Sequence, residues 1–414
     1  MDYDVVVAGA GPAGSATARD IARSGFKVLL VEEHDKVGEP SFCSGLVTPR
    51  TLELSGVSDG VVINALRGAT VRSASGRELS LGGDKVHALA IDRPAFDREL
   101  AEQAQQAGAE LLTGTKLLDI HRSDDQLSLS LDRKGKPFSM YTRLLVAADG
   151  ANSRVARWMN GAISGETVRA IGVEARLSTR NVDQVDIFVG ECIAPGWFGW
   201  IIPLGAGLAR VGIGGGNNSG KPPDQLLREL IASFPHQFDG VILARPRGHV
   251  LPIYSGARTY SDNVLLVGDA ARQVKPTTGG GVYAGLVGAR HCARTAVEAL
   301  EREDFCQGFL GRYEAYWKAE ISAEMERGVD LRRVFLSLSD RDIDRLLALL
   351  GTPPLRKMIN NLGDIDFPSP MFGQLLKAAP ILRLFLKLPL RFPWHWVTWL
   401  RDTIEGDARV AGGR

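Results

Sequence analysis

The sequence lacks the features that mark secreted, metal-binding or nucleic-acid-binding proteins. Its four cysteines are widely spaced without a C-x-x-C pair, and its seven histidines are scattered without ligand spacing. We therefore expect no metal site and a reduced, cytoplasmic setting. The formal net charge is only +1 and no Lys/Arg-rich run occurs, so we expect no nucleic acid as a partner.

Long apolar runs are also missing. No uninterrupted apolar segment reaches the roughly 18 residues that a spanning helix needs, and the start Met1-Asp-Tyr-Asp lacks the basic residues of a secretory signal. Hydrophobic residues make up 44% of the chain and charged residues 23%, which is typical of a globular protein. The length of 414 residues predicts two or three lobes.

The amino terminus predicts a dinucleotide-binding unit. A valine-rich strand over residues 3–8 leads into Gly-Ala-Gly-Pro-Ala-Gly at residues 9–14, and a helical pattern follows over residues 15–24. A second buried strand over residues 27–31 ends at the acids of residues 32–33. Strand, glycine turn, helix, strand and terminal acid together make up the unit that binds dinucleotides.

Each part of this unit has a physical role. Gly9 permits a tight turn, Gly11 lets the backbone approach a pyrophosphate, and Gly14 lets helix and strand pack closely. The helix amino terminus offers N–H groups and a partial positive charge to the phosphates, and Glu32 is placed to accept hydrogen bonds from ribose hydroxyls. The motif does not separate FAD from NAD, but its position at residue 9 of a long chain is typical of flavoproteins.

Three later segments complete a flavin site. A strand over residues 144–148 ends at Asp149-Gly150, and a strand over residues 263–267 ends at Gly268-Asp269. Glycines 279–281 then open a helix that runs to about residue 299. An Asp at a strand end can accept protons from ribityl hydroxyls, and glycines at a helix start can direct N–H groups to the N1/O2 edge of a flavin. Each segment alone is also consistent with a turn, but their order predicts FAD.

The order of these motifs resembles that of FAD proteins built like aromatic hydroxylases. The resemblance implies that Asp269 contacts the ribityl chain and that Gly280, Gly281 and Val282 lie beside the flavin ring. It places Arg98, in a segment that opens a helix at Asp92, near the phosphates; the alternative is a solvated charge on that helix. The further cofactor contacts that it implies are Ala13, Glu33, Cys43, Ser44, Gly45 and Leu117.

Three details resemble the geranylgeranyl reductase family instead of the hydroxylases. Hydroxylases carry D-G-x-x-S-x-hydrophobic-R, but Ala156 stands here in place of that Arg, and the tail Val-Ala-Arg-Trp resembles the V-x-R-W form of the reductases. Residues 38–50 resemble the family's cysteine loop, with C-x-G at Cys43. Residues 195–203 resemble its substrate signature Y-x-W-x-F-P. The resemblance covers roughly the first 300 residues.

The substrate signature is only partly matched. Trp200 and Pro203 agree with it, whereas Phe198 replaces the Tyr, so no hydroxyl is present there to donate a proton. Together with Trp197, these residues give flat apolar walls that suit a prenyl chain, although an aromatic strand in a core has the same pattern. We place Cys43 beside the isoalloxazine ring as a tentative catalytic residue; the alternative is a small buried hydrophobe.

The predicted fold class is α/β with added antiparallel sheet. We expect a Rossmann-type FAD-binding domain, an inserted β-sheet substrate domain and a carboxyl-terminal helical region. The expected division is residues 1–65, 92–164 and 261–300 for the FAD domain, residues 66–91 and 165–260 for the substrate domain, and residues 301–414 for the helical region.

The resemblance implies an FAD-dependent reductase that saturates C=C bonds of a polyprenyl lipid, diphosphate or quinone tail by hydride transfer from reduced flavin. The electron donor is NAD(P)H or a small redox protein, and the sequence does not choose between them. One alternative is an FAD-dependent monooxygenase or epoxidase of a hydrophobic substrate. Another is a flavin-stabilised membrane-binding protein without turnover.

The stretch of residues 367–400 has four Lys or Arg, no acid, and many Leu, Phe and Trp residues. Trp394, Trp396 and Trp399, with His395 among them, resemble an interfacial belt. We expect either a peripheral contact with the inner face of the membrane or a helical lid that packs on the body.

Overall fold

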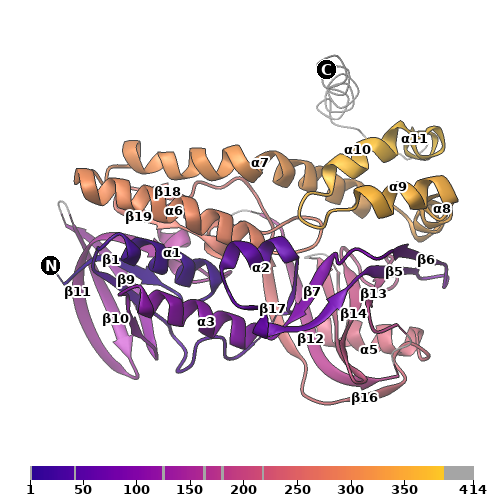
Figure 1. Ribbon diagram of the computed structural model, residues 1–414, viewed down its shortest axis with the longest axis horizontal. Coiled ribbons are helices and arrows are strands. Elements are labelled where there is room, and N and C mark those ends of the chain that lie inside the picture. The colour runs from indigo at the N-terminus through magenta and orange to yellow at the C-terminus, as the bar shows by residue number, and fades with distance from the viewer. Residues whose placement is uncertain are drawn as a thin grey trace.

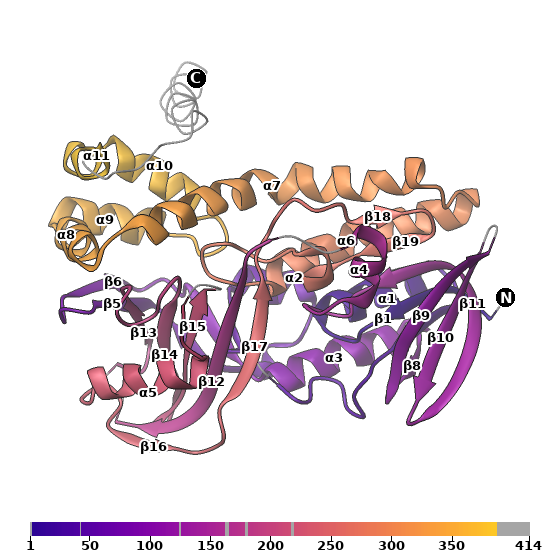
Figure 2. The same cartoon turned by 180° about the vertical axis from the view of Figure 1, so that it is seen from behind.

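The computed structural model describes residues 2–41, 43–123, 126–161, 165–178, 181–216 and 219–386. Two large sheets lie side by side, and the long helix α7 (Gln307–Ser337) runs along one side of both, as the two opposite views show (Figures 1 and 2). The carboxyl-terminal helices continue from α7 over the outer end of the second sheet (Figure 1).

The first sheet has eight strands in the order β18-β19-β11-β1-β2-β8, with β10 and β9 continuing from β11. Its core pairs are parallel, with β1 between β2 and β11. Its strands are β1 (Tyr3–Ala8), β2 (Val28–Val31), β8 (Glu110–Leu112), β9 (Thr115–Ser123), β10 (Gln126–Arg133), β11 (Lys136–Ala147), β18 (Tyr260–Ser261) and β19 (Val264–Leu266).

Both faces of this sheet are covered, which is why its central strands are almost wholly apolar. Alternate residues of β1 pack against α1 (Pro12–Arg23), α3 (Arg93–Gln106) and α6 (Val282–Arg302) in one core cluster. The other residues pack against β9, β10 and the short helix α4 (Arg154–Asn160). The carboxyl ends of the parallel strands therefore meet the amino ends of α1 and α6, where a dinucleotide site is expected.

The second sheet is mainly antiparallel, in the order β16-β12-β15-β14-β13-β5-β6, with β17 also on β12. Its strands are β5 (Gly68–Ser73), β6 (Glu78–Gly82), β12 (Thr167–Leu177), β13 (Gln184–Val189), β14 (Phe198–Gly205), β15 (Leu208–Gly216), β16 (Gly240–Ile242) and β17 (Arg247–Pro252). Helix α5 (Pro223–Ser233) covers one face through leucines. Because side chains alternate along a strand, the residues of β14 that do not face α5, such as Trp200 and Ile202, line the opposite face.

A third, small sheet connects the two. Its strands, in the order β3-β7-β4, are β3 (Leu46–Val47), β7 (Ala88–Ile91) and β4 (Val62–Leu66). In the chain, α2 (Pro49–Ser55) and η1 (Asp59–Val61) lie between β3 and β4, and α3 follows β7. The register places Leu46 opposite Ala90. The cysteine loop is thereby joined to the connection between β6 and α3.

The carboxyl-terminal part is helical, as expected. It contains α7, α8 (Asp340–Leu350), α9 (Pro353–Leu362), α10 (Ser369–Lys377) and α11 (Ala379–Leu386). Helix α8 begins with a capping box between Ser339 and Asp342, and it packs on β5 and β6 through a shared apolar cluster. None of the helices in the described residues combines the length and the apolar character needed to span a bilayer.

The predicted fold class is confirmed, with differences at the boundaries of elements. Helix α1 begins at Pro12, inside the glycine motif, because Pro suits the first turn of a helix. The strand predicted at residues 144–148 is the end of the longer strand β11, which forms a hairpin with β10. Trp394, Trp396 and Trp399, on which the interfacial belt depended, lie outside the described residues, as does all of 387–414.

Candidate FAD and substrate site

The glycine turn after β1 is fixed by close packing at two of its three positions. Gly9 has φ +102°, and a β-carbon there would lie 2.2 Å from the carbonyl oxygen of Ala148. A β-carbon on Gly14 would lie 1.9 Å from the carbonyl oxygen of Gly9. Gly11, in contrast, has no atom of the described residues within 4 Å of such a carbon, so its backbone borders open space at the amino end of α1. That opening fits a pyrophosphate.

The two acids after β2 have different surroundings. Glu32 ties the turn to the strand end, because its Oε2 accepts a hydrogen bond from the amide of Ala10 at 3.0 Å and its Oε1 one from the amide of His34 at 3.0 Å. Glu33 pairs with Lys116 at 2.5 Å, and this hydrogen bond lowers the pKa of Glu33. The neighbour of Lys116, Leu117, points into the core cluster below the sheet.

Motifs far apart in the sequence meet at this end of the sheet. A β-carbon on Gly268 would lie 3.0 Å from the β-carbon of Ala13, and one on Gly285 would lie 3.5 Å from it. A β-carbon on Gly281 would lie 2.8 Å from Oδ1 of Asp269. The amino-terminal turn, the Gly-Asp turn η2 (Gly268–Ala271) and the start of α6, which begins at Val282 directly after Gly280 and Gly281, therefore form one continuous wall.

Asp269 lies in a cluster of charged groups that the sequence did not reveal. Burial raises the pKa of Asp269, and the nearby His249 and Arg93 offset this rise only in part. Burial also lowers the pKa of His249, which comes from β17. Arg93 makes two hydrogen bonds of 3.0 Å to Asp97 and also contacts the thiol of Cys43.

Of the two cluster residues that were not predicted, Arg93 had a signal in the sequence and His249 had none. Arg93 lies four residues before Asp97 at the start of α3, and that spacing is the sequence signal of a helical ion pair. His249 stands in no motif and reaches the site only because β17 pairs with β12. Arg98, which was expected near the phosphates, is 43% exposed and lies 4.0 Å from Glu39.

The cysteine loop is held against the second sheet. Arg210 of β15 donates hydrogen bonds to the carbonyl oxygens of Ser44, at 3.1 Å, and Ile91, at 2.8 Å. Gly45 has φ +69°, and a β-carbon there would lie 2.1 Å from Nη1 of Arg210, so only glycine fits. The amide of Gly45 donates to the sulfur of Cys43 at 3.4 Å, and the Cys43 side chain is exposed rather than buried.

The aromatic segment before and within β14 packs beside the flavin-site loop, which is the glycine-containing loop of residues 275–281 before α6. Trp197 is 2% exposed and stacks on Phe198, with ring centroids 4.9 Å apart. The guanidinium of Arg332 lies 4.6 Å from the Trp197 ring centroid. A β-carbon on Gly279 would lie 3.0 Å from Cζ2 of Trp197. Trp197 is thus a buried wall behind the glycine loop.

The next aromatic residue is more open. Trp200 is half-buried and lies over Gly212, where a β-carbon would be 2.2 Å from the indole ring. Pro203 is buried, and its carbonyl oxygen accepts a hydrogen bond from Asn64 at 2.9 Å. Trp200 belongs to the apolar face with Ile202, and this face is where a hydrophobic ligand can be accommodated.

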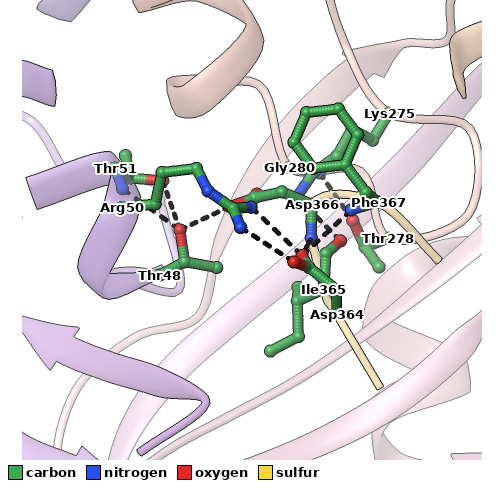
Figure 3. A network of polar contacts seen from close by, with 10 residues as sticks. All are labelled: Thr48, Arg50, Thr51, Lys275, Thr278, Gly280, Asp364, Ile365, Asp366 and Phe367. Carbon is green, nitrogen blue, oxygen red and sulfur yellow. Dashed lines mark hydrogen bonds and ion pairs between the residues drawn. The ribbon is translucent and has the colours of Figure 1, made fainter. Parts of the chain in front are cut away.

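A polar network joins the carboxyl-terminal segment to this site (Figure 3). Asp366 accepts hydrogen bonds from Lys275 at 2.7 Å and from Thr48 of the cysteine loop at 2.5 Å. Arg50 pairs with Asp364 at 2.9 Å. A β-carbon on Gly280 would lie 2.8 Å from Cε of Lys275. Residues 301–414 were expected to form a separate region, and the contact of residues 364–366 with both loops was not predicted.

The donor set fits FAD. The carboxylate of Glu32 at the end of β2, the open backbone at Gly11, the carboxyl of Asp269 and the glycines before α6 gather at one end of the first sheet, and these are the groups that a dinucleotide with a flavin requires. Within the described residues, no group of three or more His, Cys, Asp or Glu is placed to hold a metal ion.

The family comparison agrees with this geometry. Residues 2–303 match the model of the FAD binding domain family. Digeranylgeranylglycerophospholipid reductase 2 of Methanococcoides burtonii is 30% identical over 420 residues, which cover 98% of this chain and 97% of the relative. Digeranylgeranylglycerophospholipid reductase of Methanosarcina acetivorans is 32% identical, covering 91% of this chain and 92% of the relative.

The chain belongs to the FAD-binding-domain family, within the digeranylgeranylglycerophospholipid reductases. It is an FAD-dependent oxidoreductase, and the predicted resemblance to geranylgeranyl reductases is confirmed.

Solved structures show how widely the fold is shared. A geranylgeranyl bacteriochlorophyll reductase-like protein from Thermoplasma acidophilum matches with a TM-score of 0.81 at 23% identity, covering 97% of this chain and 99% of that chain. The p-nitrophenol 4-monooxygenase PnpA from Pseudomonas putida matches with a TM-score of 0.69 at 19% identity, covering 87% and 96%. Reductase-like and monooxygenase proteins thus share this architecture, and the fold alone does not separate the two activities.

Proposed function

We propose that this reductase saturates C=C bonds in the polyprenyl chain of a lipid or diphosphate. The observation that carries the proposal is the contact between Trp197 and Gly279, because the apolar wall at Trp197 then adjoins the loop that we assign to the flavin. Reduced FAD supplies the hydride when it is bound. The names of the relatives, which act on a digeranylgeranyl glycerophospholipid, support a prenyl substrate.

The protein's own residues position the alkene and deliver a proton to it. An isolated alkene is a poor hydride acceptor, so the site must hold one carbon for the hydride and a proton donor at the other. Phe198 and Trp200 hold the chain by burying methylenes, at about 0.8 kcal/mol each. The thiol of Cys43, in contact with Arg93, is the group that we propose as proton donor.

We propose the following contacts between individual residues and the FAD. We propose that Gly11 and the start of α1 bind the pyrophosphate, with Arg98 near it, and that Glu32 binds the ribose. We propose that Asp269 binds the ribityl chain and that residues 280–282 adjoin the ring. We also propose the division into an FAD-binding domain (residues 1–65, 92–164 and 261–300), a substrate domain (residues 66–91 and 165–260) and a helical region (residues 301–414).

The monooxygenase alternative is weaker. Ala156 occupies the position of the Arg in hydroxylases, and it is fully buried in the core cluster beneath the first sheet. The relatives by sequence are reductases, whereas the monooxygenase matches by fold alone. We further propose that electrons enter from NAD(P)H or a small redox protein, and that the enzyme contacts the membrane peripherally through residues 367–400.

One anaerobic experiment tests the activity. The FAD-loaded protein is reduced chemically and mixed with a geranylgeranyl lipid, while flavin absorbance reports reoxidation and mass spectrometry reports the product. We expect reoxidation without oxygen and a product heavier by two hydrogens for each bond saturated. A product that contains added oxygen and forms only in air would establish the monooxygenase. Flavin that prenyl lipid never reoxidises would favour a binding protein without turnover.

A further inference from the structure

Arg332 is a charged residue on the buried stripe of α7. The buried residues in this part of the helix recur every three or four positions, as on one helical face; they are Leu310, Tyr313, Trp317, Ile321, Met325, Gly328 and Arg332. Of these residues only Arg332 carries a charge, and its side chain is 4% exposed. A buried charge costs free energy unless its partners are well placed, so the partners of Arg332 indicate what it does there.

The guanidinium of Arg332 makes contacts with both its edge and its flat face. Nε donates to Oε2 of Glu166 at 2.8 Å, and Nη2 donates to Oε1 of the same carboxylate, so the ion pair is bidentate. Nη2 also donates to the carbonyl oxygen of Gly196 at 3.0 Å. The central carbon lies over the ring of Trp197, 4.6 Å from its centroid. Parallel donors and a flat cationic face occur together only in arginine.

Glu166 is itself held by its backbone. Its carbonyl oxygen accepts hydrogen bonds from the amide of Ile253, at 3.1 Å, and from the guanidinium of Arg272. Arg272 directly follows the turn η2, which contains Asp269, and it also donates to the carbonyl oxygen of Ile253 at 2.9 Å. The acid that binds Arg332 is therefore anchored to the turn that we assign to the ribityl chain.

Trp197 contacts both the flavin-site loop and a residue that we assign to the prenyl chain. A β-carbon on Gly279 would lie 3.0 Å from Cζ2 of Trp197, so the backbone of the loop lies against this ring. The ring of Phe198 stacks on Trp197, with centroids 4.9 Å apart. The position of the Trp197 ring therefore sets the spacing between the flavin-site loop and Phe198.

Helix α7 contacts the same loop one turn earlier. A β-carbon on Gly328 would lie 3.1 Å from Cδ of Pro276, which belongs to the flavin-site loop. Gly328 precedes Arg332 by four residues, so both lie on one face of α7. The helix thus supports the loop at two places, once directly and once through the Trp197 ring.

We propose that Arg332 is a positioning residue for the reduction of the prenyl alkene. It holds the Trp197 ring against the flavin-site loop and so fixes the distance between the bound flavin and the carbon that receives the hydride. The proposal rests on the proposed function, since it concerns the alignment of that reaction. Arg332 acts through Trp197 and not on the reacting atoms. A misplacement of about 1 Å in such an alignment can cost roughly 100-fold in rate.

Two substitutions separate the charge of Arg332 from its shape. Arg332→Met removes the charge at similar length. Arg332→Lys keeps the charge but cannot make the bidentate pair, the bond to Gly196 and the flat contact together, and it also serves if Arg332→Met does not fold. The matched control is Arg72→Met on β5, two strands from β14, where Arg72 is 14% exposed and pairs with Asp186 at 3.1 Å. Trp197→Phe is made alone and together with Arg332→Met.

Anaerobic reoxidation of the reduced, FAD-loaded protein by a digeranylgeranyl glycerophospholipid in detergent measures the rate. We expect both Arg332 variants to lower the rate at saturating lipid by about 10- to 100-fold, with little change in the lipid concentration that gives half the maximal rate. Arg72→Met should keep the wild-type rate. The double variant should be no slower than Trp197→Phe alone, because Arg332 acts through that ring.

The visible absorption spectrum of the bound, oxidised FAD reports on the flavin-site loop without turnover. We expect Arg332→Met and Trp197→Phe to shift the flavin bands in the same way, and Arg72→Met to leave them unchanged. If the lipid never reoxidises the wild type and these shared shifts appear, the proposed function fails and the placement of the loop by Arg332 stands. If the wild type reduces the lipid and the Arg332 variants keep both its rate and its spectrum, the inference about Arg332 fails alone.

Three further results would refute the role of Arg332. One is an Arg332→Lys protein with the full rate, because the Trp197 ring would then need no bidentate guanidinium. Another is a double variant slowed by the product of the two single effects, since the two residues would then act independently. The third is an Arg332→Met protein that is slowed no more than Arg72→Met, with equal loss of stability in urea unfolding.

Discussion

Lys275 and Asp366 form a 2.7 Å ion pair in which both side chains are almost wholly buried. The two residues are 91 positions apart in the chain. Their pair joins the loop that leads to Gly280 with the segment between α9 and α10. Thr48 also binds Asp366, so one carboxylate holds the flavin-site loop, the cysteine loop and the carboxyl-terminal segment together (Figure 3).

Removal of one partner of this pair leaves a buried charge without compensation. We predict that Asp366→Ala lowers the free energy of unfolding by about 3–5 kcal/mol and weakens FAD binding. The double variant Lys275→Met/Asp366→Leu removes both charges at similar volume and should lose much less stability. Urea unfolding of the apo-proteins and FAD titration measure the two effects. Equal losses in the single and the double variant would show that shape matters here and charge does not.

The glycine turn offers a test that separates folding from cofactor binding. Gly11 has space for a side chain and φ −69°, so Gly11→Val should fold with normal stability. It should bind FAD about 100-fold more weakly or worse, because the new side chain fills the space beside the phosphate-binding amides. Gly14→Ala should instead destabilise the fold, since its β-carbon would collide with the backbone of Gly9.

Thermal unfolding of the apo-proteins and FAD titration distinguish the two variants. A Gly11→Val protein that binds FAD normally would place the pyrophosphate elsewhere. A Gly14→Ala protein as stable as the wild type would mean that the turn relaxes to accept a β-carbon.

The dinucleotide unit could be predicted in detail because its signals are local. The valine-rich β1, the glycines and the acid at Glu32 each determine their own backbone geometry, and the structure has β1 at Tyr3–Ala8 as expected. The turns at Asp149 and Asp269 could also be placed, because each follows a run of buried residues at the end of a strand. Periodicity and turn chemistry are sufficient for such elements.

Contacts between distant segments could not be predicted. Nothing near His249 in the sequence indicates a site, because its position depends on the register of β17 against β12. The contact of Asp366 with Lys275 depends on how α7 to α10 fold back over the sheets. Trp197 illustrates a partial success: the segment was recognised, but the burial of Trp197 depends on the absence of a side chain at Gly214.

The pKa of Asp269 predicts how stability changes with pH. Burial raises this pKa, with His249 and Arg93 opposing, whereas a carboxyl in the unfolded chain titrates near pH 4, at about 3.9. The folded state therefore holds this proton to higher pH than the unfolded state does. The contribution of Asp269 to stability is complete below about pH 4 and is lost as the pH rises through its folded pKa.

We predict that Asp269→Asn removes this loss. The apo-variant should gain stability relative to the wild-type apo-protein between acidic and neutral pH, while its affinity for FAD falls. Thermal unfolding at a series of pH values measures the difference, with the exposed Asp59→Asn as the control. A difference between variant and wild type that does not change with pH would show that Asp269 has the same pKa folded and unfolded.

Trp200 tests whether the aromatic face binds substrate. It is half-buried on the side of the sheet away from α5, and its ring rests on Gly212. We predict that Trp200→Ala weakens binding of a prenyl substrate by about 2 kcal/mol, or roughly 30-fold, because several methylenes lose their apolar contact. FAD affinity should not change, since no cofactor contact is proposed for this ring. Substrate dependence of anaerobic flavin reoxidation measures the effect.

The matched control for Trp200 is Trp158→Ala. Trp158 is 44% exposed on α4, where its ring packs against Arg122 at the far side of the first sheet. The Trp158→Ala substitution removes an indole of the same size without altering the aromatic face. The substrate dependence of flavin reoxidation should therefore stay as in the wild type. If both variants lose affinity equally, the loss reflects general destabilisation. If Trp200→Ala alone slows reoxidation at saturating substrate and leaves the affinity intact, the ring aligns the reacting carbon instead of providing apolar contact.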